Sequence, residues 1–111
     1  MPASNRSYSK LTKQALILMG QQIKLARKKR KMSEHDLAER AGIARSTLQK
    51  IEMGAPQIDI GFVFEAAILT GVPLFEPETT SLAPQIERIK DRLALMPTYI
   101  RKPKREVKDD F

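Results

Sequence analysis

The sequence predicts an all-α protein, and three kinds of signal support this fold class. From about Thr12 onward, apolar residues recur at steps of three and four, the spacing that places side chains on one face of a helix. Ser33 and Asp36 have the spacing of a capping box, which marks the start of a helix. Gly42 and Gly54 each follow a segment of helical periodicity, where a left-handed residue typically ends a helix. No segment has the alternating pattern of a β-strand.

Five helices follow from these signals, with expected bounds 12–31, 33–41, 45–53, 59–70 and 82–96. We expect Asp59 to cap the fourth helix, Gly71 to end it, and Pro84 to be tolerated in the first turn of the fifth. The inner face of the fourth helix is expected to contain Phe62, Val63, Ala66 and Ala67. The expected organisation is a flexible arm at 1–11, a compact helical domain at 12–75, a linker and C-terminal helix at 76–96, and a charged, irregular tail at 97–111.

Positive charge is concentrated at the two ends of the chain. The 111 residues include 20 Lys and Arg against 13 Asp and Glu, for a net charge of +7. Residues 1–31 hold nine cations and no acid, residues 32–80 three cations and eight acids, and residues 81–111 eight cations and five acids. Such a basic chain is expected to bind a polyanion, with nucleic acid as the first partner to consider, while the acidic middle or the tail suits a protein partner.

The composition also argues against several classes of protein. Because the chain has no cysteine and only one histidine, His35, it offers no two-histidine or thiolate metal site and no nucleophile–base pair. We therefore expect no metal, no cofactor and no enzymatic activity. The longest apolar runs are far too short to span a membrane, and the N-terminus lacks the apolar stretch of a secretory signal, so a cytoplasmic protein is expected.

Residues 33–54 have the pattern of a helix-turn-helix: two short helices, a tight turn with Gly42, and the small Ala38 where the helices cross. The stretch SEHDLAERAGIARSTLQKIEMG closely resembles the Cro/repressor-type (Xre) helix-turn-helix family. Positions that match the family pattern are Ile23, Arg27, Leu37, Ala38, Gly42, Ile43, Leu48, Ile51, Glu52 and Gly54. The resemblance spans about residues 20–72 and implies a five-helix, lambda-repressor-like DNA-binding domain. A five-helix bundle with accidental matches is the alternative.

Two shorter stretches resemble a narrower group. GAPQIDIG, at residues 54–61, is similar to a segment of HipB-like antitoxins, and the ending RKPKREVKDDF is similar to the basic-then-acidic tails of regulators encoded beside HipA-like kinases. The resemblance implies a homodimer that represses its own operon. It also implies binding to a HipA-like serine/threonine kinase toxin.

The family resemblance also implies which residues contact DNA. Its third helix is the recognition helix, and the corresponding positions here are Arg45, Ser46, Gln49 and Lys50. Arg and Lys can bond guanine O6 and N7, Gln can pair with adenine, and Ser can reach a base or a phosphate. The alternative is an ordinary solvated helix face. Two positions depart from the family pattern: Glu34 replaces the usual Gln and should repel a nearby phosphate, and Met53 offers no donor.

Other charged residues have expected roles away from the bases. The resemblance implies that Arg27 and Glu52 pair within the domain and fix the crossing of the first and third helices. The cations of the stretch 28–31 are either a solvated helix end or include one or two phosphate contacts. Lys31 occupies a position where the family commonly has Gly, so its turn is expected to be strained. Met19, Met32 and Met96 are expected to fill the core.

The fifth helix has an apolar stripe at steps of four and three, formed by Leu82, Ile86, Ile89, Leu93 and Met96. Three interpretations remain open: packing onto the domain, a dimer seam, or a docking site for another protein.

Together these observations predict a transcriptional repressor that binds double-stranded operator DNA as a homodimer, in an operon with a HipA-like kinase. The alternatives are a solitary phage-type or chromosomal repressor, and a toxin-binding subunit with weak DNA contacts.

Overall fold

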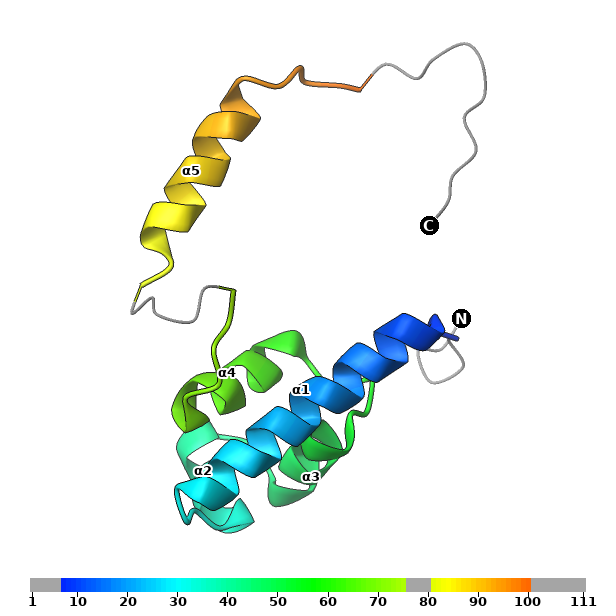
Figure 1. Cartoon of the computed structure of the whole chain (residues 1–111), viewed down its shortest axis with the longest axis vertical. Coiled ribbons are helices and arrows are strands. Elements are labelled where there is room, and N and C mark those ends of the chain that lie inside the picture. Colours follow the sequence, from blue (N-terminus) through cyan, green and yellow to red (C-terminus); the bar gives the residue numbers. More distant parts are fainter. Residues whose placement is uncertain (1–6, 76–80, 101–111) are drawn as a thin grey trace. The chain divides into compact units, whose positions relative to one another are not determined.

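A computed structural model describes residues 7–75 and 81–100, and all the regular structure in these two ranges is helical. The helices are α1 (Lys10–Lys29), α2 (Glu34–Ala41), α3 (Arg45–Met53), α4 (Ile60–Thr70) and α5 (Ala83–Ala94). The chain divides into two compact units, Met1–Glu78 and Thr79–Phe111. The first contains α1 to α4, which are gathered around one core (Figure 1). The all-α prediction is confirmed.

The longest helix, α1, begins at Lys10 rather than near Thr12. Ser9 caps it, because its hydroxyl accepts a hydrogen bond from the Thr12 amide at 3.2 Å. The last residues assigned to the flexible arm are therefore helical, whereas residues 1–6 lie outside the described part of the chain. The helix ends at Lys29 rather than Lys31, and Lys31 has the positive φ of 59° that its turn requires.

The helix-turn-helix, α2 and α3, has the caps predicted from the sequence. The Asp36 amide donates to the Ser33 hydroxyl at 3.0 Å, and the Ser33 amide donates to the Asp36 carboxylate at 3.2 Å. This reciprocal capping box starts α2. Gly42 ends α2 with φ of 71°, and Gly54 ends α3 with φ of 82°, both in the left-handed region. The predicted starts and ends of these helices are confirmed.

Helix α4 differs from its prediction at two points. Asp59 precedes the helix but its side chain forms no capping hydrogen bond. Phe62 was expected on the inner face and is 40% exposed, whereas Ala66 and Ala67 are fully buried as expected. Val72, just after the helix, is buried: its amide donates to the Ala67 carbonyl at 2.8 Å, which turns the chain onto the core.

The core of the first unit is small and contains residues from α1 to α4. Its buried apolar members are Ile23, Leu37, Ala38, Leu48, Ile51, Ala66, Ala67 and Val72. Met19 and Met32 pack against it, as expected of core-filling methionines. Gly20 lets α1 approach α3 closely: a Cβ atom at this position would lie 2.8 Å from the carbonyl oxygen of Glu52.

The second unit contains α5, which is shorter than predicted. The helix spans Ala83–Ala94, so Leu82 and Met96, the two ends of the predicted stripe, lie outside it. Pro84 is in its first turn, where a missing amide hydrogen leaves no helical bond unmade. No residue of α5 is buried, and Met96 is 56% exposed, so the prediction that Met96 fills the core is wrong.

Candidate nucleic-acid interface

The outer face of α3 is polar and exposed. The nine-residue helix buries Leu48, Ile51 and Glu52 against the rest of the domain. A helix turns by roughly 100° per residue. Residues on the opposite side of α3 from these three therefore point away from the domain. Five residues of α3 are exposed. One is the apolar Met53 at its end, and the other four are those that the sequence proposes as DNA contacts: Arg45, Ser46, Gln49 and Lys50. The third residue of the helix, Thr47, is partly buried.

Glu34, the first residue of α2, joins α2 to this face through two hydrogen bonds to α3. Its Oε1 atom accepts a bond from Arg45 Nε at 3.0 Å and another from Gln49 Nε2, also at 3.0 Å. The Glu34 side chain is 26% exposed, and that of Arg45 is 64% exposed. The hydrogen bonds from Gln49 and then from Arg45 lower the pKa of Glu34 below its ordinary value, so this carboxylate is ionised at neutral pH.

This arrangement adds a second role to the one expected of Glu34. The sequence predicts a carboxylate that repels phosphate, and the structure shows one that organises two of the proposed contact residues. Arg45 and Gln49 lie 11 and 15 positions after Glu34, so helical periodicity along the chain does not predict their contacts with it. The sequence does contain a signal, namely an acid at the start of one helix of the pair and long donors on the exposed face of the other.

Ser46 and Lys50 differ from their neighbours on α3. Neither side chain forms a hydrogen bond or ion pair with residues 7–75 or 81–100. The two residues are four apart, so they lie on adjacent turns of the same helix face. This face therefore combines two donors held by Glu34 with a hydroxyl and an ammonium group that are open to a ligand.

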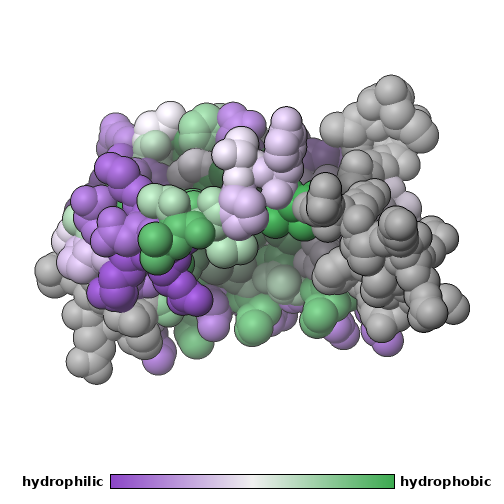
Figure 2. Space-filling model, turned by 90° about the horizontal axis from the view of Figure 1, so that it is seen from above, coloured by the Kyte–Doolittle hydropathy of each residue, from purple (hydrophilic) through white to green (hydrophobic). Residues whose placement is uncertain are grey.

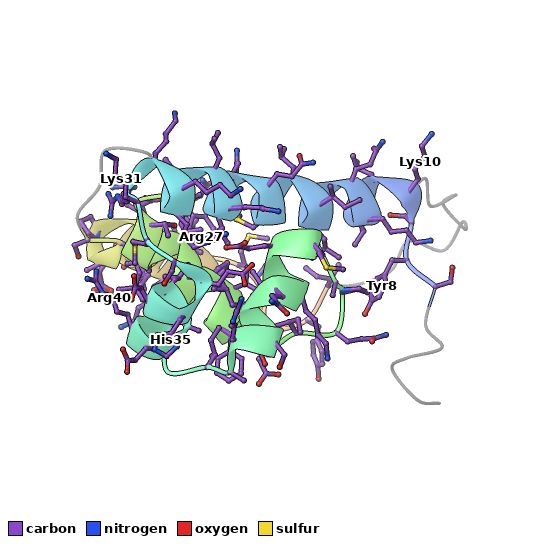
Figure 3. All side chains as sticks on the ribbon, turned by 90° about the horizontal axis from the view of Figure 1, so that it is seen from below. Tyr8, Lys10, Arg27, Lys31, His35 and Arg40 are labelled. Atoms are coloured by element: carbon purple, nitrogen blue, oxygen red, sulfur yellow. The ribbon has the colours of Figure 1, made fainter. Side chains whose placement is uncertain are left out.

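Arg27 is committed to the interior of the domain. Its Nε and Nη2 atoms donate to the two carboxylate oxygens of Glu52 at 2.7 and 3.0 Å, and its Nη1 atom donates to the Met32 carbonyl at 3.0 Å. Both residues are buried, with 5% of Arg27 and 7% of Glu52 exposed. The hydrogen bond to Glu52 raises the pKa of Arg27 above its already high ordinary value. The expected Arg27–Glu52 pair is confirmed, and Figure 3 shows Arg27 beneath α1, inside the domain.

The cations at residues 28–31, at the end of α1, differ in their contacts. Arg30 donates from Nη1 to the Leu69 carbonyl at 3.0 Å and so satisfies a carbonyl in the last turn of α4. The other cations of this stretch are exposed and have no ion-pair partner in the described part of the chain; they are Lys28, Lys29 and Lys31. Within this stretch, these three lysines are the cations whose side chains remain available for a phosphate.

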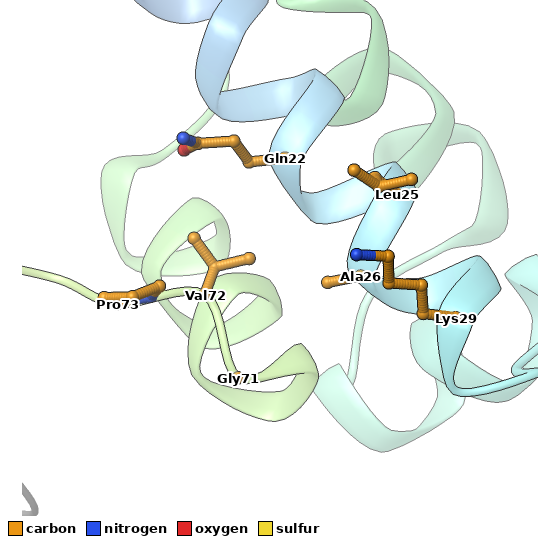
Figure 4. Close-up of a pocket in the computed structure, with 7 residues that line it drawn as sticks. All are labelled: Gln22, Leu25, Ala26, Lys29, Gly71, Val72 and Pro73. Atoms are coloured by element: carbon orange, nitrogen blue, oxygen red, sulfur yellow. The ribbon is translucent and has the colours of Figure 1, made fainter. Parts of the chain in front are cut away.

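Apolar surface also occurs on the first unit. A shallow pocket lies between α1 and the segment after α4, lined by Leu25, Ala26, Lys29 and Val72 among others (Figure 4). Several large apolar side chains of α1 are exposed, including Leu11, Leu18 and Leu25. Figure 2 shows hydrophobic residues at the surface beside hydrophilic ones.

Three further findings concern the described residues. No group of three or more potential metal ligands gathers in residues 7–75 and 81–100. His35 is exposed at the start of α2 (Figure 3). None of the helices there is long and apolar enough to cross a membrane.

The comparison with known families agrees with this geometry. Residues 23–76 match the model of the family described as helix-turn-helix. The matched segment begins within α1, includes α2, α3 and α4, and ends just after them. No curated protein and no solved structure matches the chain.

Proposed function

We propose, from the premise that residues 23–76 form a helix-turn-helix domain, that this protein is a sequence-specific DNA-binding regulator of transcription. In this proposal α3 enters the major groove and reads base edges, while α2 crosses the backbone above it. Double-stranded operator DNA is the ligand.

The observation that supports this proposal best is the pattern of burial on α3. Its inner residues hold the helix in the domain, and its outer residues are the exposed polar set Arg45, Ser46, Gln49 and Lys50. These side chains have the donors that bind guanine, adenine and phosphate. The domain has its own core, and Leu48 and Ile51 of α3 are part of it, so the core holds this helix in place.

The regulator is proposed to act as a repressor and as a homodimer. A single nine-residue recognition helix contacts few base pairs, whereas two copies related by a twofold axis contact two half-sites about one helical turn apart. The exposed Ile86, Ile89 and Leu93 of α5 supply apolar surface that suits an interface. A palindromic operator is therefore expected.

We further propose that the protein is the antitoxin and autorepressor of a HipA-like kinase operon. This rests on the resemblance of residues 54–61 and of the C-terminal tail to HipB-like antitoxins. The tail from 101 onward lies outside the described residues. Co-purification with the product of the neighbouring gene separates this role from that of a solitary repressor.

A second candidate function is a protein-interaction subunit with weak DNA binding. It is favoured by Leu11, Leu18 and Leu25, which are 74%, 55% and 58% exposed at intervals of seven residues on α1. Residues seven apart are about two turns apart on nearly the same face of a helix. These three leucines therefore form an apolar stripe along α1.

Selection of DNA from a random duplex library by the full-length protein tests the main proposal. A regulator of this kind enriches one palindromic sequence and binds it at least about 1,000-fold more tightly than unrelated DNA. Enrichment of no sequence, together with stable capture of the neighbouring gene product, would favour the interaction subunit instead.

A further inference from the structure

One carboxylate oxygen holds two of the proposed DNA contacts. Glu34 Oε1 accepts from Arg45 Nε and from Gln49 Nε2, each at 3.0 Å. The three side chains come from the starts of α2 and α3 and from the next turn of α3. Glu34 therefore links the two halves of the helix-turn-helix on the side that faces the proposed ligand.

We propose that Glu34 is a specificity-determining residue, which orients Arg45 so that it reads guanine rather than phosphate. This inference rests on the proposed function and names the base that the same site recognises. Glu34 acts as a positioning residue, and Arg45 makes the contact.

The chemistry of the guanidinium group supports guanine as the target. Arg has five N–H donors, and its Nε–H lies on one side of the planar group. Because Arg45 Nε donates to Glu34, the edge formed by the two Nη atoms of Arg45 remains available to a ligand. Neither Nη atom of Arg45 donates to any residue in the described ranges. Two adjacent donors match the O6 and N7 acceptors that guanine presents in the major groove.

The charge balance disfavours a phosphate as the partner of Arg45. Its positive charge already faces the negative charge of Glu34, so the pair is close to neutral towards the DNA backbone. Glu34 therefore weakens the attraction of Arg45 to phosphates in any DNA sequence. In exchange, it fixes two Nη donors in an orientation that favours one base. An arginine held in its bound conformation also loses less conformational freedom on binding.

Gln49 is oriented by the same carboxylate. One amide hydrogen of Gln49 is used by Glu34, which leaves the second hydrogen and the carbonyl oxygen. A donor beside an acceptor is the pattern that pairs with adenine N7 and N6. Because a carboxylate only accepts hydrogen bonds, Glu34 turns the Nε2 atom of Gln49, rather than its Oε1 atom, towards itself.

The experiment uses the full-length protein and the duplex that it selects from a random library. Each operator position is replaced by the other three base pairs, and the Kd is measured for wild type, Arg45→Ala, Glu34→Ala and Glu34→Gln. An unrelated duplex measures general affinity. Glu39→Ala is the matched control, since it removes one exposed acid from the same helix, and the Glu39 side chain forms no hydrogen bond or ion pair with residues 7–75 or 81–100. Circular dichroism verifies that each variant is folded.

The expected result is localised to one guanine in each half-site. Arg45→Ala lowers the preference for guanine there by about 5- to 100-fold, the range for one bidentate contact. Glu34→Ala lowers the preference at the same position by about 3- to 10-fold, the value of one hydrogen bond. It leaves binding to the unrelated duplex unchanged or tighter, because an acid has been removed. Glu34→Gln, which retains an acceptor, loses less, and Glu39→Ala retains the full preference.

Three results would overturn the inference. In the first, Glu34→Ala retains the wild-type guanine preference. In the second, Glu34→Ala loses preference equally at every position, as a merely structural defect would. In the third, Arg45→Ala weakens all duplexes alike, as a phosphate contact would. These outcomes leave the proposed function standing, because wild type still selects an operator. If wild type selects no sequence, the proposed function fails and the inference fails with it.

Discussion

Arg27 and Glu52 are joined by two hydrogen bonds, of 2.7 and 3.0 Å, in the interior of the domain, although they are 25 residues apart in the chain. The pair connects the last turns of α1 and α3. It therefore sets the position of α3, the proposed recognition helix, relative to the longest helix of the domain. Both groups are removed from solvent, so each depends on the other for compensation of its charge.

Replacement of one partner of this pair should be far more damaging than replacement of both. Arg27→Ala leaves the Glu52 carboxylate buried and unpaired, which typically costs about 3–5 kcal/mol of unfolding free energy. The double variant Arg27→Leu/Glu52→Leu removes both charges and should regain much of that loss. Urea unfolding followed by circular dichroism measures both values. A single variant as stable as wild type would show that the pair does not contribute to the fold.

Gly20 should not tolerate alanine, although alanine favours helices. A Cβ atom there would meet the backbone carbonyl oxygens of Ile51 and Glu52, so α1 and α3 would have to separate. We expect Gly20→Ala to destabilise the domain by about 1–3 kcal/mol, as overpacking does. Gly61→Ala is the control, since nothing lies within 4 Å of its added Cβ. It should stabilise α4 by about 0.5–1 kcal/mol. Equal melting temperatures for the two variants would contradict this account.

Acid should destabilise the protein through the start of α2. The hydrogen bonds from the Ser33 backbone and side chain lower the pKa of Asp36, and those from Gln49 and Arg45 lower the pKa of Glu34. A carboxyl group whose pKa is lower in the folded state stabilises that state above its unfolded pKa and loses this effect as pH falls through its folded pKa. The melting temperature should therefore decline as pH falls below about 4.

Asp36→Asn tests the assignment of this acid sensitivity. The variant lacks one of the two carboxylates, so its melting temperature at pH 7 should be lower than that of wild type. The difference should shrink steadily towards pH 2, where the wild-type carboxyl is protonated as well. A difference that stays constant across this range would assign the acid sensitivity to other groups.

Lys50→Ala should weaken binding to all DNA sequences alike. This lysine has no ion-pair partner in the described ranges, unlike Arg45, so its charge is available to a phosphate. Loss of one phosphate contact should reduce the slope of log Kd against log salt by about 0.9. Lys24→Ala, an exposed cation on α1, is the comparison. Fluorescence anisotropy at several salt concentrations gives both slopes; a change confined to one operator base pair would show that Lys50 reads a base.

The full-length chain should be a dimer in solution. Sedimentation at micromolar concentration is expected to give about twice the chain mass of 12.6 kDa. Replacement of Ile89 by Glu places a charge on an exposed apolar face of α5 and should shift the protein towards monomer. A clean monomer for wild type would remove the palindromic operator from the proposed function.

The sequence by itself was sufficient for the features that depend on neighbouring residues. The capping box at Ser33 and Asp36 and the left-handed glycines at the ends of α2, α3 and α4 are local signals, so the helix bounds there are as predicted. Helical periodicity likewise places Arg45 and Lys50 on the exposed side of α3, because a turn of 3.6 residues separates outward from inward positions whatever the helix packs against. The Arg27–Glu52 pair was available only through the family resemblance.

The tertiary structure decided which side chains meet across helices. Glu34 contacts Arg45 and Gln49, Arg30 reaches a carbonyl 39 residues away, and Val72 turns into the core, all because of how closely and at what angle the helices approach. No periodic pattern along the chain encodes that angle, since it results from the shapes of all the packed side chains together. The helix-turn-helix and its outer face were therefore predictable from the sequence, whereas the carboxylate that orients the proposed reading residues was recognisable only once α2 and α3 were packed.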